Sequence, residues 1–138
     1  MYKWNKCTMH AYMHACLKKE GLEGEDYSYP IYGVINDSNG FYAALTNRNR
    51  LLLAEFTILT GSPVQMYVLE LDSLIFVKVK KNIINQYTFT LVFNIDGRKR
   101  KFILLVSKKL YGSDFNEQGK NLKEYVELFE KMKYKLEY

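Results

Sequence analysis

The chain contains little of what marks the special classes of protein. Its 138 residues include only 2 Cys, 2 Pro and 8 Gly. Two cysteines are too few for a disulfide framework or a four-cysteine zinc site. So little proline and glycine excludes collagen-like and Pro-rich low-complexity chains. With 48% hydrophobic and 25% charged residues, the composition is that of a globular protein large enough to bury its own core.

The chain also lacks the common catalytic motifs. It has no Gly-rich phosphate loop, no nucleophile elbow and no Cys-x-x-Cys pair. Only 2 His are present, so a His-based triad would have to recruit His10 or His14. The sequence therefore predicts a protein that is not an enzyme, with no catalytic residue and no cofactor.

Long hydrophobic runs are absent as well. The longest apolar runs, Leu51–Ala54 and Phe102–Val106, are far shorter than the ~20 residues of a membrane-spanning helix. The charged first residues are not followed by the apolar segment of a signal peptide. These absences predict a cytoplasmic protein, in which the cysteines would stay reduced.

Charge is distributed unevenly along the chain, whose formal net charge is +5. Residues 1–70 carry 6 basic and 7 acidic residues, whereas residues 71–138 carry 14 basic and 8 acidic residues. Between Lys78 and Lys109 the only acidic residue is Asp96. A basic segment of this kind permits an anionic partner but does not require one.

The two ends of the chain have helical patterns. Tyr2–Glu20 contains no Pro or Gly, and Gly21 can adopt the left-handed conformation that ends a helix. The polar, acidic residues 21–26 are then expected to form a linker. A second apolar stripe at helical spacing comprises Leu122, Val126, Phe129, Met132 and Leu136. Ser113 or Asp114 is expected to cap the start of this C-terminal helix.

Between these helices the pattern is that of short strands. Gln86–Ile95 alternates between apolar and polar residues, and Asp96-Gly97 after it is a hairpin turn signal. Seven strands are expected in a meander: Tyr29–Ile35, Phe41–Thr46, Arg50–Ile58, Met66–Leu71, Leu74–Lys80, Gln86–Ile95 and Arg98–Val106. They predict a mainly-β α+β protein, with a seven-stranded antiparallel barrel or sandwich, a C-terminal amphipathic helix and an added N-terminal helix. Residues 1–26 form the N-terminal helix and linker, and residues 27–138 the barrel with its C-terminal helix, as a single structural unit.

Two segments carry a resemblance to a known family. Leu45–Leu52 resembles the Thr-Asn-x-Arg-Leu strand–turn–strand signature of the bacterial pleckstrin-homology (PH)-like domain family, with one extra residue at Asn49. Leu69–Leu74 resembles the segment that follows this signature in the family. The resemblance covers about Tyr29 to Met132 and implies a PH-like barrel. The N-terminal helix resembles the helical extension of some bacterial members.

The resemblance does not bring phosphoinositide binding with it. PH domains that bind phosphoinositides use basic residues on and beside the loop that joins the first two strands. Here that loop, residues 36–40, contains Asp37 and no Lys or Arg, and neither flanking strand contains a basic residue. The sequence therefore argues against specific phosphoinositide binding.

The strongest positive feature is a set of basic residues on neighbouring strands. The candidate anion-binding residues are Lys78, Lys80, Arg98, Lys99, Arg100 and Lys101. They could bind the phosphates of an anionic membrane surface or of nucleic acid. The simpler interpretation, which we favour, is a solvated sheet edge whose lysines prevent aggregation. No aromatic residue lies within the run of 98–101 to stack on bases, which argues against nucleic acid.

A thiol and two imidazoles lie on one stripe of the predicted N-terminal helix. Cys7, His10 and His14 are spaced at i, i+3 and i+7, and together they could bind zinc. No fourth ligand is present in the segment, and Ala11 stands where the zinc-protease helix motif has Glu. The simpler interpretation is a half-exposed helix with two ordinary histidines and a buried cysteine.

Aromatic and apolar residues suggest contacts with other proteins. Tyr is abundant, in two groups: Tyr27, Tyr29 and Tyr32, and Tyr125, Tyr134 and Tyr138. Tyrosine is favoured at interfaces, although it also fills small cores. The predicted N-terminal helix holds more large apolar residues than one buried face requires: Trp4, Met9, Tyr12 and Met13. The sequence therefore predicts an interaction or assembly module that binds a protein partner or itself, and it favours self-association through this helix. It leaves open whether the helix packs on its own barrel or on a neighbour's. The alternative is electrostatic binding to an anionic membrane surface or nucleic acid through the basic residues.

Overall fold

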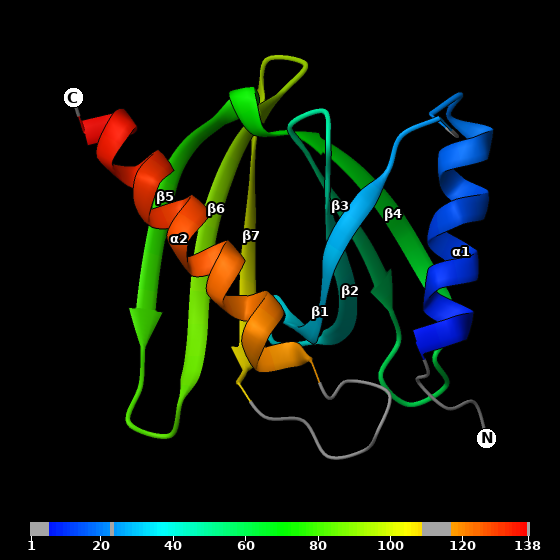
Figure 1. Ribbon diagram of the computed structural model, residues 1–138, viewed down its shortest axis with the longest axis horizontal. Coiled ribbons are helices and arrows are strands. Elements are labelled where there is room, and N and C mark those ends of the chain that lie inside the picture. Colours follow the sequence, from blue (N-terminus) through cyan, green and yellow to red (C-terminus); the bar gives the residue numbers. More distant parts are fainter. Residues whose placement is uncertain (1–5, 23, 109–116, 138) are drawn as a thin grey trace.

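The computed structural model describes residues 6–22, 24–108 and 117–137, and it contains two helices and seven strands. In chain order these are α1 (Lys6–Lys19), β1 (Tyr27–Ile35), β2 (Asn39–Thr46), β3 (Arg50–Phe56), β4 (Pro63–Glu70), β5 (Leu74–Lys81), β6 (Gln86–Ile95), β7 (Arg98–Ser107) and α2 (Gln118–Glu137) (Figure 1). A short 3-10 helix, η1 (Leu71–Ser73), joins β4 to β5. The predicted mainly-β α+β fold class is confirmed.

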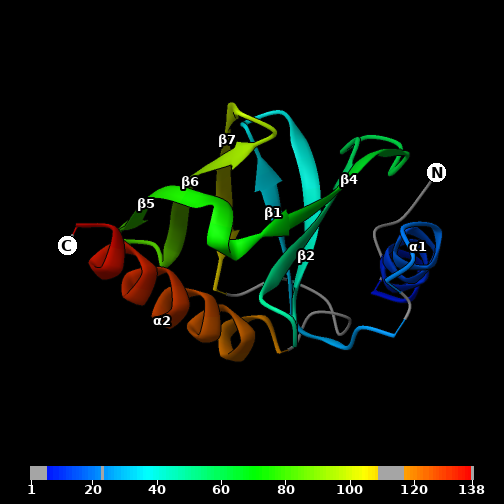
Figure 2. The ribbon, with the colours of Figure 1, turned by 90° about the horizontal axis from the view of Figure 1, so that it is seen from above.

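All seven strands belong to one antiparallel sheet in the order β4-β3-β2-β1-β7-β6-β5. The predicted meander is therefore interrupted once, because β4 and β5 lie at opposite edges of the sheet and β1 pairs with β7. The sheet curls around its core, with α2 across its open side and α1 against its outside (Figure 2). A curled sheet whose two edge strands do not pair with each other needs another element to cover its opening, and α2 does so.

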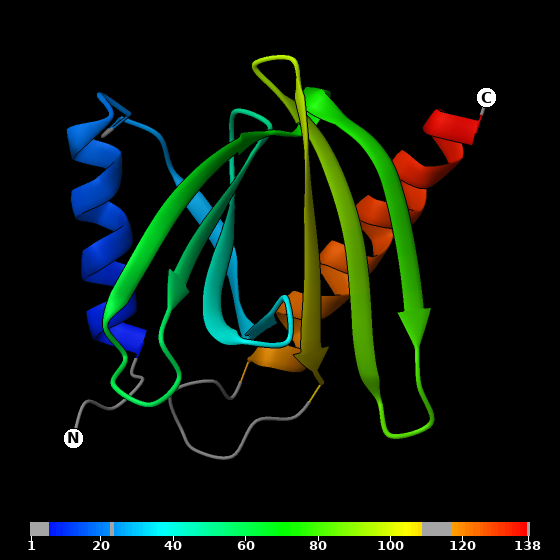
Figure 3. The ribbon, with the colours of Figure 1, turned by 180° about the vertical axis from the view of Figure 1, so that it is seen from behind.

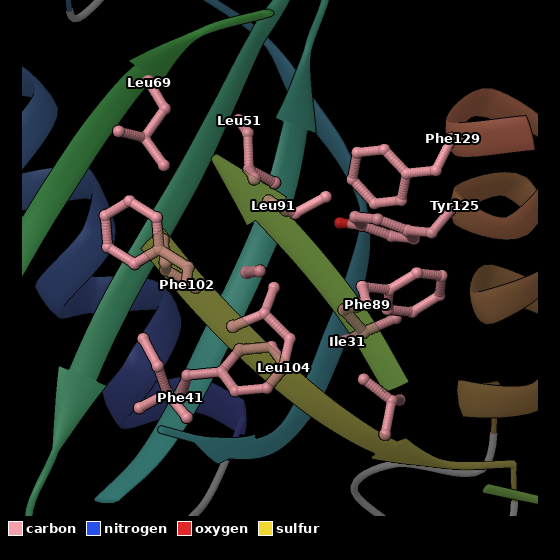
Figure 4. Close-up of a cluster of buried hydrophobic side chains, with 14 of the residues drawn as sticks. Ile31, Phe41, Leu51, Leu69, Phe89, Leu91, Phe102, Leu104, Tyr125 and Phe129 are labelled. Carbon is pink, nitrogen blue, oxygen red and sulfur yellow. The ribbon is translucent and has the colours of Figure 1, made fainter. Parts of the chain in front are cut away.

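The main core lies on the inner face of the curled sheet. Strand alternation turns every second residue of β6 and β7 inward, so that Phe89, Leu91, Phe102 and Leu104 are at most 1% exposed. The inward face of α2 closes this core with Leu122, Tyr125 and Phe129 (Figure 4). Each such side chain contributes about 1.5–3 kcal/mol by leaving water, so the core accounts for the position of α2.

Polar side chains of α2 also hold it to β1. Gln118 exchanges two hydrogen bonds with the backbone of Tyr32, at 2.7 and 3.1 Å. Asn121 Nδ2 donates to the Pro30 carbonyl at 3.0 Å, and the Tyr125 hydroxyl donates to the Tyr29 carbonyl at 2.7 Å. Tyr29 has φ 56 beside an irregularity in the β1–β2 register. These side chains therefore satisfy backbone groups of β1 where regular strand pairing is interrupted.

A second, smaller core lies on the outer face of β2 and β3. It consists of Met13, Leu17, Tyr42, Ala44, Leu52, Ala54 and Phe56. The first two belong to α1, so the N-terminal helix packs on the sheet of its own chain. Both faces of β2 and β3 are thus covered, which explains why these strands are continuously apolar rather than alternating.

The segment with the Thr-Asn signature forms a tight turn between β2 and β3. Thr46 Oγ1 accepts hydrogen bonds from the backbone N–H groups of Arg48 and Arg50, each at 3.2 Å. Asn49 takes the left-handed conformation at φ 61. The additional residue at this position is therefore accommodated by the turn, because asparagine tolerates positive φ better than most residues.

The arginine that follows this turn joins three segments of the chain. Its guanidinium binds Glu70 on β4 and Glu25 before β1, both at 2.6 Å. The hydrogen bond to Glu70, with the charge of Glu25, raises the pKa of Arg50. Glu25 itself is only 7% exposed, so one residue of the predicted polar linker, residues 21–26, is buried. Its carboxylate is buried because it has a cationic partner.

Most element boundaries match the sequence prediction closely, and the differences are local. β4 begins at Pro63, three residues before the predicted strand, because a proline is tolerated at the start of an edge strand. Leu136, predicted to belong to the apolar stripe of the C-terminal helix, is 45% exposed near its end. Ser113 and Asp114, the predicted caps, lie outside the described residues.

Candidate functional site

Four of the predicted anion-binding residues share one face of the sheet. Lys78 pairs with Thr90 and Lys80 with Thr88, on the outer face of β5 and β6. Lys99 and Lys101 on β7 have the parity opposite to the buried Phe102 and so point to the same outer face. These four lysines, which we call the lysine face, are exposed, and no described helix or strand covers them.

The two arginines of the predicted set lie elsewhere. Arg98 and Arg100 have the parity of Phe102 and lie toward the inner side of β7. The guanidinium of Arg100 lies 5.5 Å from the ring centroid of Tyr67, to whose hydroxyl it donates at 3.4 Å. It also lies 5.8 Å from the ring centroid of Phe102. Arg100 therefore covers the end of the main core, and the run 98–101 is divided between two faces.

The lysine face is long and partly apolar. Lys99 is paired with Asn94 and Lys80 with Thr88, so the two lie about 20 Å apart along β6, at ~3.4 Å per residue. Phe76, on the same face, is 48% exposed. This surface is a loose array of cations among apolar and hydroxyl side chains, and it lacks the convergent geometry of a pocket for a single phosphate.

The two edges of the sheet differ in charge. β5 carries Lys78, Lys80 and Lys81, the usual protection of an edge strand. The other edge has no charged residue between Thr57 and Leu69, a range that includes nearly all of β4 and the β3–β4 loop. Side chains of this uncharged edge are exposed: Ile58 46%, Leu59 86% and Val64 49%. Its outer side pairs with no other strand in the described part of the chain.

The β1–β2 loop, which corresponds in position to the phosphoinositide-binding loop of PH domains, is held to β7 by hydrogen bonds. Asn36 and Asp37 take left-handed conformations at φ 51 and 58, which form the tight β1–β2 turn. The Asn36 N–H donates to the Ile103 carbonyl at 2.8 Å, and its side-chain Oδ1 accepts from the Ile103 N–H at 2.9 Å. The polar atoms of this turn thus extend the sheet toward β7, and no basic side chain is close in sequence to hold a phosphate.

The candidate metal ligands are only partly described. His10 and His14 are exposed on α1, and His10 Nε2 lies 3.0 Å from the hydroxyl of Tyr27. The side chain of Cys7 lies outside the described residues. Among the side chains that the structure does describe, no group of three His, Cys, Asp or Glu residues is placed to hold a metal ion. Zinc binding by these three residues, the weaker of the two interpretations from the sequence, is therefore not tested.

The tyrosines, which sequence patterns could not assign, have distinct environments. Tyr125 is 1% exposed, and burial, with a contribution from Tyr42 nearby, raises its pKa well above the ordinary value. The hydroxyl of Tyr42 is buried without a hydrogen-bond partner in the described part of the chain, and burial raises its pKa as well. Burial and a hydrogen bond with Cys16 raise the pKa of Tyr12 to about 12. At least Tyr42 and Tyr125 are therefore core residues rather than interface residues.

A groove of about 410 Å³ runs between α2 and the start of β6. Tyr87, Leu122 and Val126 form its apolar part, and Lys108, Lys123 and Glu127 flank it. A single carboxylate beside two lysines is neither a nucleophile–base pair nor a pair of carboxylates. The groove therefore offers no arrangement from which a reaction could be derived.

The strand order and the C-terminal helix can be compared with the resemblance that the sequence carries. A seven-stranded antiparallel sheet in this order, with a C-terminal helix packed on it, is consistent with a PH-like fold. Comparisons with protein-family models, with curated proteins and with solved structures give no significant match. Neither α1 nor α2 has the length and apolarity that crossing a membrane requires.

Proposed function

We propose that this chain is a non-enzymatic PH-like interaction module that associates with a second copy of itself through the edge formed by β4. One observation supports the proposal above all: the range from Thr57 to Leu69 carries no charge, and the outer side of β4 pairs with no strand in the described part of the chain. A free edge strand presents unpaired N–H and C=O groups that can pair with another strand. Proteins that stay apart normally place charges on such an edge, as this chain does on β5.

A symmetric pairing of β4 with β4 of a second copy suits the chemistry of this edge. In an antiparallel two-fold arrangement the edge of one copy contacts the same edge of the other copy, so any charge on it would face a like charge across the interface. An edge without charge brings no like-charge repulsion to such a pairing. The exposed Leu59 and Val64 would then be removed from water near the contact.

The proposed contact lies at the β4 edge and not on the N-terminal helix, which the sequence prediction favours. Met13 and Leu17 of α1 are 0% and 1% exposed because they pack on β2 and β3 of the same chain. These two side chains are therefore not available to a partner. Trp4 and the side chain of Met9 lie outside the described residues and do not enter the proposal.

Velocity sedimentation at micromolar concentrations tests this proposal directly. We expect a dimer for the wild type and a monomer for the double variant Leu59→Lys/Val64→Lys, because the charges would repel across the two-fold contact. The matched control is Ile75→Lys/Phe76→Lys, which adds the same charges at the other edge and should leave the dimer intact. Circular dichroism verifies that each variant is folded. A monomeric wild type, or a dimer lost only in the control, would contradict the proposal.

A second candidate function rests on the lysine face. Four exposed lysines on an uncovered sheet face, in the basic half of the chain, favour contact with an anionic surface. Such binding should weaken steeply with added salt, because neither the lysines nor their partners are shielded from water. Association that does not change with salt would remove this candidate.

A further inference from the structure

The hairpin that joins β5 to β6 ends in two exposed isoleucines. Ile83 is 101% exposed and Ile84 is 66% exposed. These residues occupy the tip of the hairpin, which lies on the side of the molecule away from α1 and at the end of β6 away from the β6–β7 turn (Figures 1 and 3). Exposure to water is unfavourable for both aliphatic side chains, so contact with an apolar partner at this tip would be favourable.

Hydrogen bonds within the hairpin hold the isoleucines outward. Asn82 Oδ1 accepts from the backbone N–H groups of Ile84 and Gln86, each at 3.0 Å. The Asn82 side-chain amide donates to Gln86 Oε1 at 2.9 Å, and Asn85 takes the left-handed conformation at φ 60. The two asparagines thus form a turn closed by hydrogen bonds, with the isoleucines on its outside. Little conformational entropy is lost when a tip ordered in this way binds.

Cations surround the tip. Lys80 and Lys81 precede it directly, and the ammonium of Lys81 lies 5.8 Å from the ring centroid of Tyr87. Lys108 adjoins it from the end of β7, since its N–H donates to the Asn85 carbonyl at 3.1 Å. No acidic residue occurs between Leu74 and Ile95. The tip therefore combines an aliphatic end with a basic collar of Lys80, Lys81 and Lys108.

We propose that this tip is a membrane anchor: Ile83 and Ile84 enter the interface of an anionic lipid bilayer, while the basic collar binds the headgroups. A bilayer surface offers an apolar region immediately below negative charges, which is the order that the hairpin presents. Nucleic acid offers the charge, but its contacts for aliphatic side chains lie in the grooves and between base steps rather than immediately below the phosphates. The inference goes beyond self-association through β4 and rests on none of its evidence.

The anchor differs from electrostatic binding through the residues first selected from the sequence. Arg98 and Arg100 lie toward the inner side of β7, and Asp96 precedes them in the β6–β7 turn. That turn lies at the opposite end of β6 from the isoleucines. A bilayer held by the tip would therefore lie far from this turn, and the two sites can be separated by mutation.

Co-sedimentation with lipid vesicles tests the anchor. Vesicles of phosphatidylcholine alone are compared with vesicles that also contain phosphatidylserine, at low and high salt. We expect the wild type to bind only the second kind. The variant Ile83→Ser/Ile84→Ser should lose about tenfold or more in affinity, and Lys80→Gln/Lys81→Gln a similar factor together with part of the salt dependence. The control Ile75→Ser/Phe76→Ser removes exposed apolar residues at the other end of β5 and should bind as the wild type does.

A second readout reports insertion itself. The variant Ile83→Trp adds an indole at the tip, and its fluorescence relative to the wild type should shift to shorter wavelength only with phosphatidylserine vesicles. A wild type that binds neither vesicle overturns the proposal. So does an isoleucine variant that is folded and binds undiminished, or loss of binding only when Arg98, Lys99, Arg100 and Lys101 are changed to Glu. If the wild type binds no vesicle but binds a protein partner, and loses that partner when Ile83 and Ile84 are replaced, the tip is a site for that protein instead.

Discussion

The outer face of the sheet differs between its two halves, although both halves obey the same strand alternation. On β2 and β3 the outward side chains are buried beneath α1: Tyr42, Ala44, Leu52, Ala54 and Phe56. On β5 and β7 the corresponding positions include four exposed lysines, with threonines between them on β6. The outward residues of a sheet therefore indicate whether it is covered, since apolar residues favour a covering element and charged residues favour exposure to water.

The same division separates the proposed contacts. The edge of the covered half is uncharged and is proposed to meet a second copy. The uncovered half carries the basic surface and, at its end, the aliphatic tip of the β5–β6 hairpin. In Figure 3 β4 and the β5–β6 hairpin lie on opposite sides of the molecule, so a dimer through the first leaves the second accessible.

The largest effect is expected from placing one charge on each half. Leu52→Glu buries a carboxylate between the sheet and α1, and it should lower the free energy of unfolding by about 4 kcal/mol or more. Thr90→Glu places the same carboxylate opposite Lys78 on the uncovered face, where the change should stay within about 0.5 kcal/mol. Urea unfolding of both variants measures the difference. Similar losses from the two substitutions would show that the lysine face is covered after all.

A medium effect is expected from weakening the contact of α1 with the sheet. Leu17→Ala should cost about 2–5 kcal/mol, because the side chain is 1% exposed and leaves a cavity. The matched control is Ile83→Ala on the β5–β6 tip, which should change stability by no more than about 0.5 kcal/mol. Thermal unfolding compares the two. A Leu17→Ala variant as stable as the control would mean that α1 contributes nothing to the stability of the sheet.

The smallest effects are expected from the two buried tyrosines. Tyr125→Phe removes the donor to the Tyr29 carbonyl and should cost about 1 kcal/mol at neutral pH. Tyr42→Phe removes a buried hydroxyl that has no partner among the described residues, so it should be neutral or slightly stabilising. Urea unfolding at neutral pH measures both, and a costly Tyr42→Phe would reveal a partner for that hydroxyl.

Stability at alkaline pH is a further test of the same two tyrosine variants. Folding raises the pKa of both tyrosines above 10.0, so the unfolded chain loses these protons first. Their contribution to stability is fully present below pH 10 and is lost as the pH rises through the folded pKa values, by about 1.4 kcal/mol per pH unit for each tyrosine. Each phenylalanine variant should therefore show a shallower alkaline loss of stability than the wild type. An unchanged slope in either variant would contradict the raised pKa of that residue.

How far sequence patterns predict this fold depends on the range of the contacts involved. Gln86–Ile95 was bounded correctly because its alternation is visible in adjacent residues. Glu25 belongs to the predicted polar linker, and its burial depends on Arg50, which lies in another segment. Arg100 was grouped with its neighbours in the run 98–101, but its position is decided by Tyr67 on β4. The sequence prediction does not include the exposed isoleucines of the β5–β6 tip, although the lysines before them and the asparagines around them indicate an exposed turn.

Local sequence patterns account for the helices, the strands, and which residues of each strand share a face. Periodicity and turn chemistry act between residues a few positions apart, so these properties need no partner elsewhere. Only the tertiary structure decided that β1 pairs with β7, that α1 covers its own sheet, and that Tyr125 belongs to the core. Those outcomes depend on which distant surfaces meet when the sheet curls, and the free energy gained by burial there is a property of the pair of surfaces rather than of either segment alone.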